Sequence, residues 1–200
     1  MNKLYTAVLF GALVLASAAS EAQTQRVRAI ITGLDGNVLA VKSLDGRDLK
    51  VHLADKVEVR YAKAITLADI KPGDFLGATT VKRADGAHVA LEIHTFPADL
   101  HGVVNQGQSL TDLQPGATMT NAIVSAMVQA TGGRELTLEH KGSSTKVIVP
   151  EGIPLVTTVA ADRSLLVPGE YVYVIAQVAP DGKLSAARVQ VSKDGVRPPQ

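Results

Sequence analysis

The sequence of 200 residues contains no cysteine and no tryptophan. Without cysteine the chain has no disulfide bonds, no thiolate metal ligands and no lipidated N-terminal cysteine, so its stability must come from packing. A charge excess of one sign is lacking too, because 20 Lys and Arg residues stand against 19 Asp and Glu residues. A chain this balanced has no electrostatic reason to bind nucleic acid or an anionic membrane, and we expect neither partner.

Long apolar runs are lacking after the first residues. Residues 1–22 have the pattern of an export signal, in which Lys3 is followed by the apolar run LYTAVLFGALVLASAA and by the small-residue pattern SEA before Gln23. We therefore predict that this segment is removed and that the mature protein is periplasmic or secreted, without a membrane segment. A cut after Ala18 is the alternative cleavage site.

The sequence does contain an internal repeat. The segment IKPGDFLGATTVKRADGAHVALEI (70–93) is echoed by LVPGEYVYVIAQVAPDGKLSAARV (166–189), at an offset of 96 residues that aligns Pro72-Gly73 with Pro168-Gly169. An offset kept over about sixty positions, and shifted only at an expected loop, is typical of a duplicated module. We interpret the Pro-Gly-Asp motif as a turn that determines the fold.

Short stretches of alternating apolar and polar residues fill each copy. Examples are RVRAIITGL, NVLAVKS and HVALEIHTF, which are rich in β-branched residues and lie next to Asp-Gly or other turn residues. Alternation with period two predicts strands, and Asp-Gly pairs are common two-residue hairpin turns. Five or six short antiparallel strands in about seventy residues suit a small closed barrel, because closure removes exposed edges.

We predict an all-β fold of two tandem small antiparallel barrels. The first module is 23–96, the second is 123–192, and a C-terminal tail follows at 193–200. The connector, 97–122, has no counterpart in the repeat and is too apolar for a solvated linker, so we expect it to pack between the modules. Its apolar residues are Leu100, Val103, Val104, Leu110, Leu113 and Met119.

The repeated pattern of strand, L-x-D-[IL]-x-P-G-D, strand and D-G-x-x-x-A-x-x-[IV] resembles an exported bacterial β-barrel domain of unknown function with OB-like topology. The stretches DLQPGATMTNA and VPGEYVYVIAQ are similar to a group of small secreted proteobacterial proteins, some of them labelled metal-transporter permeases. The resemblance covers nearly the whole mature chain and implies OB-like barrels. Members of the group often have Gly-Glu-Gly and a Trp before DLQPG, whereas this chain has Asn105-Gln106-Gly107 and Ser109-Leu110-Thr111.

Five histidines in an exported chain make metal binding one possible function. His88 and His94 lie six residues apart, roughly 20 Å along a straight strand, so one ion cannot bind both. Glu92 and His94 share a strand face, and His101 of the connector could complete a site of nitrogen and oxygen ligands. The alternative is that Glu92 and His94 are two polar residues on a solvated strand face.

A cleft between the two barrels is the other candidate site, because ligand sites favour domain junctions. Polar residues of the connector would line it. They are Asp112, Gln114, Thr118, Thr120 and Asn121. The alternative is that these side chains cap turns, as such residues do in many loops.

Common catalytic motifs are missing: the sequence has no Gly-x-Ser-x-Gly elbow, His-Glu-x-x-His motif or phosphate loop. We therefore predict no enzymatic activity and no cofactor. The leading hypothesis is an exported binding or structural protein with a surface for a small ligand or a protein partner at the barrel junction. A periplasmic metal-binding accessory protein and an enzyme of unrecognised class are the alternatives.

Overall fold

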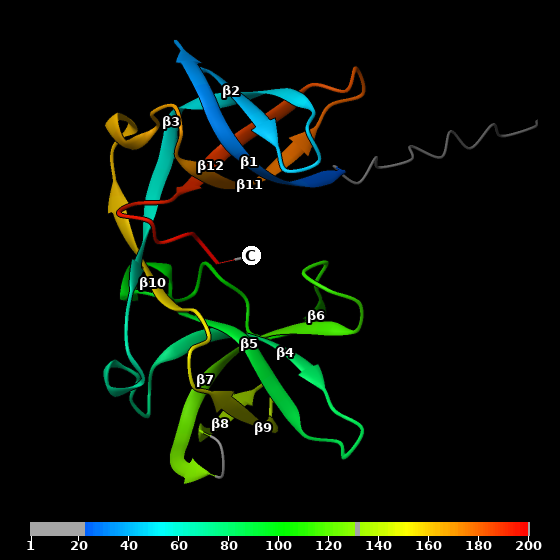
Figure 1. The fold of residues 1–200 in the computed structure, drawn as a ribbon, viewed down its shortest axis with the longest axis vertical. Coiled ribbons are helices and arrows are strands. Elements are labelled where there is room, and N and C mark those ends of the chain that lie inside the picture. Colours follow the sequence, from blue (N-terminus) through cyan, green and yellow to red (C-terminus); the bar gives the residue numbers. More distant parts are fainter. Residues whose placement is uncertain (1–22, 131–132, 200) are drawn as a thin grey trace, which may run out of the picture.

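The computed structural model describes residues 23–130 and 133–199, which fold almost entirely as β-strands (Figure 1). The predicted all-β class is confirmed. The predicted signal segment, 1–22, lies outside the described residues. The strands are β1 (Thr24–Asp35), β2 (Val38–Ser43), β3 (Asp48–Ala64), β4 (Phe75–Lys82), β5 (His88–Thr95), β6 (Gly107–Leu110), β7 (Ala117–Ala130), β8 (Gly133–His140), β9 (Ser143–Pro150), β10 (Leu155–Ala161), β11 (Tyr171–Val178) and β12 (Leu184–Val191). Three short 3-10 turns are η1 (Leu67–Asp69), η2 (Ala98–Leu100) and η3 (Arg163–Leu165). In the described part of the chain no helix has the length and apolar character needed to cross a membrane.

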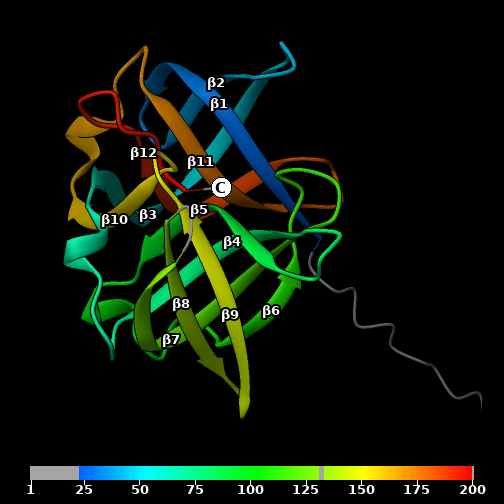
Figure 2. The same ribbon diagram turned by 60° about the horizontal axis from the view of Figure 1, so that its bottom comes forward.

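Backbone pairing closes these strands into two five-stranded barrels. The first ring runs β1–β2–β3–β12–β11 and returns to β1. The second ring runs β7–β8–β9–β5–β4 and returns to β7. In both rings the third and fourth strands are parallel and all other neighbours are antiparallel, so the two barrels have the same strand order. The first barrel lies above the second in Figure 1, and Figure 2 brings the second forward.

Each barrel is assembled from both halves of the chain. The first barrel combines β1, β2 and β3 with β11 and β12, and the second combines β4 and β5 with β7, β8 and β9. The predicted modules, 23–96 and 123–192, follow the sequence repeat, whereas the barrels exchange strands between those modules. The reason lies in β3, whose 17 residues span roughly 55 Å and carry the chain out of one barrel and into the other.

A pair of strands, β3 and β10, crosses from one barrel to the other. They are antiparallel, and Ala62 pairs with Thr158 at the centre of their register. In the sequence offset of 96 residues these two positions correspond to each other, so an approximate twofold relation between the halves would pass through this pair. The internal duplication itself stays a prediction.

Both apolar cores are shared between the halves, as the strand exchange requires. In the first barrel eight of the sixteen buried residues precede the connector: Val27, Ala29, Ile31, Leu39, Val41, Val51, Leu53 and Val59. The other eight follow it: Leu166, Val172, Val174, Ala176, Leu184, Ala186, Val189 and Val191. The second core combines Ile70, Leu76, Ala78, Ala90 and Ile93 with Ala122, Val124, Leu136, Leu138, Val147 and Val149.

The two Pro-Gly turns tie the halves together. Gly73 has a positive φ of 96° and its N–H donates to the carbonyl of Val124 in β7. Gly169, with φ of 94°, donates in the same way to the carbonyl of Ile31 in β1. A side chain at either glycine would strain this conformation. The motif therefore acts as a turn that anchors each strand pair to the barrel wall supplied by the other half.

The segment predicted as a connector, 97–122, is partly built into the second barrel. From Ala117 onward it belongs to β7, and β6 pairs alongside the start of that strand. Leu100 is buried, but Leu110 and Val103 are 77% and 58% exposed, so these two do not pack between the barrels as expected. They lie in short loop and edge segments that have solvent on one side.

The C-terminal tail turns back towards the junction of the barrels. Pro198 and Pro199 are buried, although Arg197 before them is exposed. The end of the described chain lies between the upper and the lower barrel in Figure 1. The tail therefore forms part of the structure between the barrels.

Candidate functional site between the barrels

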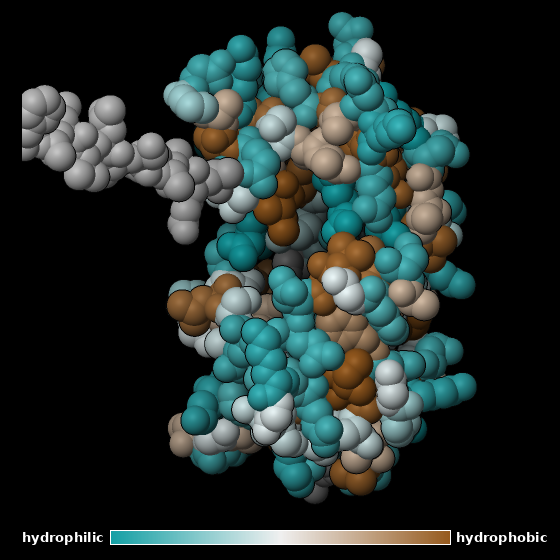
Figure 3. Space-filling model, turned by 180° about the vertical axis from the view of Figure 1, so that it is seen from behind, coloured by the Kyte–Doolittle hydropathy of each residue, from teal (hydrophilic) through white to brown (hydrophobic). Residues whose placement is uncertain are grey.

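A cavity of about 280 Å³ lies at the junction of the two barrels. Its walls come from the outer faces of both barrels, from the connector and from the C-terminal tail. Seen from behind, the surface is hollowed between the two barrels (Figure 3). The lining residues are Arg26, Arg60, His94, Phe96, Leu100, Val104, Ser109, Thr111, Met119, Asn121, Thr158, Tyr173, Ile175, Arg188, Gln190 and Pro199.

The second barrel contributes a row of residues across three neighbouring strands. His94 of β5 is the register partner of Gly77 in β4, and Gly77 is also the partner of Asn121 in β7. Ile93 next to His94 is buried in the barrel core, so alternation turns His94 to the outer face. Because Gly77 has no side chain, the ring of His94 and the amide of Asn121 pack directly over its backbone.

The first barrel contributes a matching row. Register pairs run from Arg28 in β1 to Tyr173 in β11, then to Gln190 in β12 and on to Arg60 in β3. Val172, Val174, Val189 and Val191 are the sequence neighbours of the two middle residues and are buried in the core. The row therefore lies on the outer face of this barrel, and three of its four members line the cavity.

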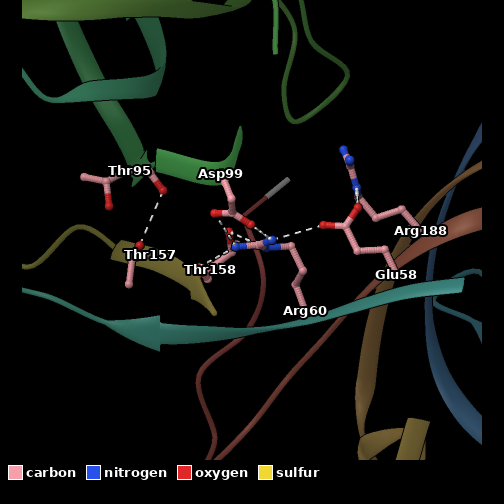
Figure 4. A network of polar contacts seen from close by, with 7 residues as sticks. All are labelled: Glu58, Arg60, Thr95, Asp99, Thr157, Thr158 and Arg188. Atoms are coloured by element: carbon pink, nitrogen blue, oxygen red, sulfur yellow. Dashed lines mark hydrogen bonds and ion pairs between the residues drawn. The ribbon is translucent and has the colours of Figure 1, made fainter. Parts of the chain in front are cut away.

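Arg60 joins the two barrels to the connector (Figure 4). Its side chain is 4% exposed, and its Nη1 donates to Glu58 at 3.0 Å and to Asp99 of η2 at 2.8 Å. Its Nε donates to the hydroxyl of Thr158 and its Nη2 to the Thr158 carbonyl, both at 3.3 Å. With a further bond from Nη2 to Asp99, all five guanidinium N–H groups are used. Arg60 therefore holds the wall of the cavity in place.

The carboxylates that pair with these arginines stay ionised. The hydrogen bond from Arg60 lowers the pKa of Asp99 below its usual value. Burial opposes ionisation of Glu58, but bonds from Arg188 and Arg60 outweigh it and lower its pKa as well. Neither carboxylate lines the cavity. Within the part of the chain that the structure describes, the charged groups on the cavity wall are therefore guanidinium groups.

Three polar atoms on this wall have no hydrogen-bond partner. They are Nδ1 of His94, Oδ1 of Asn121 and Oε1 of Gln190, and each is buried. The Asn121 amide is held by a bond from its Nδ2 to the carbonyl of Asn105 at 3.3 Å. Within the described residues only one other buried side-chain atom, Nδ1 of His88, lacks a partner, so these atoms concentrate at one cavity. Native proteins leave few such groups unpaired, and a cluster of them therefore needs an explanation.

The close packing of side chains over Gly77 leads to a stability prediction. A Cβ there would lie 2.4 Å from Cε1 of His94 and 2.9 Å from Oδ1 of Asn121. We expect Gly77→Ala to lower the free energy of unfolding by about 1–3 kcal/mol, because the ring of His94 must leave its present position, where it packs edge-on against Phe96. Urea denaturation measures the change. The control is Gly33→Ala in β1, where a Cβ meets nothing within 4 Å. Equal stability losses in the two variants would contradict the close approach at Gly77.

His94 leads to a prediction about pH. The side chain is 8% exposed, and burial lowers its pKa from 6.5 to about 4. Above pH 6.5 the histidine is neutral in both states. Below it the unfolded chain binds a proton that the folded chain does not, so stability falls by about 1.4 kcal/mol per pH unit until about pH 4, or roughly 3 kcal/mol in all.

The check is to compare the unfolding free energy of wild type and His94→Gln at about pH 7.5 and about pH 4.5. We expect the variant to lose less stability on acidification than the wild type. His52→Gln, which changes an exposed histidine, is the control and should keep the wild-type slope. An unchanged slope in His94→Gln would show that this imidazole accepts a proton in the folded protein.

Of the residues predicted to bind a ligand, the structure brings Asn121 to the cavity. Asp112 instead forms a double hydrogen bond with Arg28, at 2.8 and 3.0 Å. Gln114 is exposed. Thr118 contacts the hydroxyl of Thr80, and Thr120 accepts a bond from Gln108. The predicted set is therefore divided between the cavity and nearby structural contacts.

The predicted metal-binding residues do not form a site. Among the described residues no group of three or more His, Cys, Asp or Glu side chains could hold a metal ion. Glu92 accepts a bond from the hydroxyl of Thr79 at 3.2 Å, and the Nε2 of His101 contacts the carbonyl of Phe96 at 3.0 Å. Glu92 and His94 are both buried, so the alternative of a solvated strand face does not describe them either.

The residues that the first barrel contributes to the cavity were not predicted from the sequence. Arg60, Arg188 and Gln190 were not candidates, although each is a polar residue in an apolar, alternating strand, within VEVRYA and ARVQV. That alternation identifies an outward face. It does not tell which outward faces meet, because that depends on the strand exchange.

Comparisons with protein-family models, with curated proteins and with solved structures find no match for this chain.

Proposed function

We propose that this chain is an exported, non-enzymatic binding protein that holds a small polar ligand in the cavity between its barrels. The observation that supports this proposal is the set of unpartnered polar atoms on His94, Asn121 and Gln190. Burying such an atom without a partner costs about 1–3 kcal/mol. A ligand whose groups reach these atoms, once the side chains turn towards the cavity, would recover much of this cost on binding.

The composition of the wall favours binding over catalysis. The lining residues include no carboxylate, and His94 with its low pKa is a weak base. General acid–base catalysis needs a group whose pKa lies near the working pH. Apolar side chains such as Phe96, Met119 and Ile175 complete the wall. A wall that combines apolar side chains with convergent polar groups supports binding of a small molecule.

Replacing the unpartnered groups tests the proposal. In the empty protein, Gln190→Met removes a buried polar atom that has no partner, so we expect an unfolding free energy equal to wild type or up to about 1–2 kcal/mol higher. Asn121→Leu also loses the bond from Nδ2 to the Asn105 carbonyl, so we expect its unfolding free energy to stay within about 1 kcal/mol of wild type. Thermal and urea denaturation measure this. Gln108→Met is the control, because it removes a formed bond to Thr120 and should not stabilise. If both cavity variants lost about 1–3 kcal/mol, ordered water would already satisfy these atoms and the proposal would fail.

A further inference from the structure

The charge of the cavity wall points to an anionic ligand. Three of the lining side chains are arginines, Arg26, Arg60 and Arg188, and no lining residue is Asp or Glu. The paired carboxylates, Glu58, Asp99 and Asp112, lie outside the lining. Among the described residues, a ligand in this cavity therefore meets cationic side chains and no anionic one, which favours a negative group.

These guanidinium groups differ in whether they have N–H donors left for a ligand. Arg60 has used all five N–H groups on Glu58, Asp99 and Thr158. Arg188 donates its Nε to Glu58 at 2.8 Å, and among the described residues its Nη1 and Nη2 have no partner. Two free terminal nitrogens in one plane match the two oxygens of a carboxylate. Arg188 is therefore the residue best able to bind one.

Hydrogen-bond acceptors line the same cavity, one on the strand of Arg188 and one on the other barrel. Gln190 follows Arg188 by two residues on β12, so both side chains point out of the first barrel. Its Oε1 and the Oδ1 of Asn121, on the second barrel, are buried acceptors without a donor. A ligand that satisfies both must carry hydroxyl or N–H groups in addition to its negative charge.

The volume of the cavity matches a ligand of about the size of one monosaccharide. At about 30 Å³ for each water, a cavity of about 280 Å³ holds about nine waters. That volume suits a monosaccharide. Apolar lining residues, Phe96, Leu100 and Ile175 among them, provide contacts for the C–H groups of such a ligand.

On the basis of the proposed function, we propose that the ligand is a small hydroxylated carboxylate of monosaccharide size, that is, a sugar acid. Arg188 binds its carboxylate through Nη1 and Nη2. Its hydroxyl groups donate to Oε1 of Gln190 and Oδ1 of Asn121. The first barrel thus binds the carboxylate and one hydroxyl group, and Asn121 of the second barrel binds another hydroxyl group.

Calorimetric titration of the mature protein with D-galacturonate and D-galactose tests the ligand class, because these probes differ only in the carboxylate. We expect galacturonate to bind at least about tenfold more tightly than galactose. Arg188→Met should remove this preference. Arg47→Met, at an exposed arginine paired with Asp45 outside the cavity, should keep it.

Equal affinities for the two sugars would overturn the carboxylate assignment and leave the proposed function intact. A preference that survives Arg188→Met would overturn the role of Arg188. Absence of heat with both probes at about 10 mM would overturn the sugar-acid class. The stabilities of Gln190→Met and Asn121→Leu decide the proposed function independently, since they need no ligand.

Discussion

Cut between Asn105 and Gln106, the chain is expected to give two fragments that fold only together. Fragment 23–105 holds the three strands β1, β2 and β3 of one barrel but only β4 and β5 of the other, so it closes neither ring. Each fragment leaves about half of both apolar cores without a partner. We expect separate fragments without a cooperative thermal transition, and an equimolar mixture that regains the circular dichroism spectrum and transition of the intact chain.

This experiment distinguishes barrels that exchange strands from barrels that each form within one half of the chain. If 23–96 and 123–192 formed barrels on their own, each fragment would melt cooperatively without the other. Stable heterodimer in the mixture, measured by sedimentation, is the expected result. We also expect each isolated fragment to aggregate, because its unpaired strand edges can pair with further copies of the chain.

Arg60→Met is expected to lower the free energy of unfolding by about 3 kcal/mol. Removing one partner of a buried ion pair costs about 3–5 kcal/mol, because the other charge stays without compensation. Here the cost lies at the lower end, since the side chain of Asp99 is 60% exposed and can be hydrated. The hydroxyl and carbonyl of Thr158 lose their donors as well. Urea denaturation measures the loss.

Two further variants serve as controls for this prediction. Arg47→Met, which breaks an exposed pair with Asp45, should change stability by no more than about 0.5–1 kcal/mol. Asp99→Asn weakens only the contact of Arg60 with the connector, and its loss of stability should fall between those of Arg60→Met and Arg47→Met. A value for Arg60→Met as small as the one for Arg47→Met would mean that Arg60 does not hold the junction together.

Much of the fold could be predicted, because its signals are local. Alternation in segments such as NVLAVKS identified strands, and the Asp-Gly pair at 45–46 lies in the turn between β2 and β3. Strand exchange could not be predicted in the same way. Whether β5 pairs with the third strand of its own half or with β9 changes no local pattern, and the outcome depends on how far β3 extends.

The cavity lies at the junction where the sequence placed a candidate site, but most of its lining residues were not predicted. A junction between barrels was expected to hold the ligand, and Asn121 was named correctly as a residue at that junction. Arg188 and Gln190 could not be chosen, because outward-facing polar residues occur on every strand. Gly77 gave no signal at all, since its role depends on His94 and Asn121, residues that are distant in sequence.

A crystal structure of the mature protein grown with D-galacturonate tests the central claim most directly, namely that the cavity between the barrels binds a ligand. The predicted result is density for one sugar acid, with its carboxylate at Nη1 and Nη2 of Arg188 and hydroxyls at Oδ1 of Asn121 and Oε1 of Gln190. The contradicting result is a fixed set of waters that satisfies these atoms and His94 Nδ1 and stays unchanged with the sugar present.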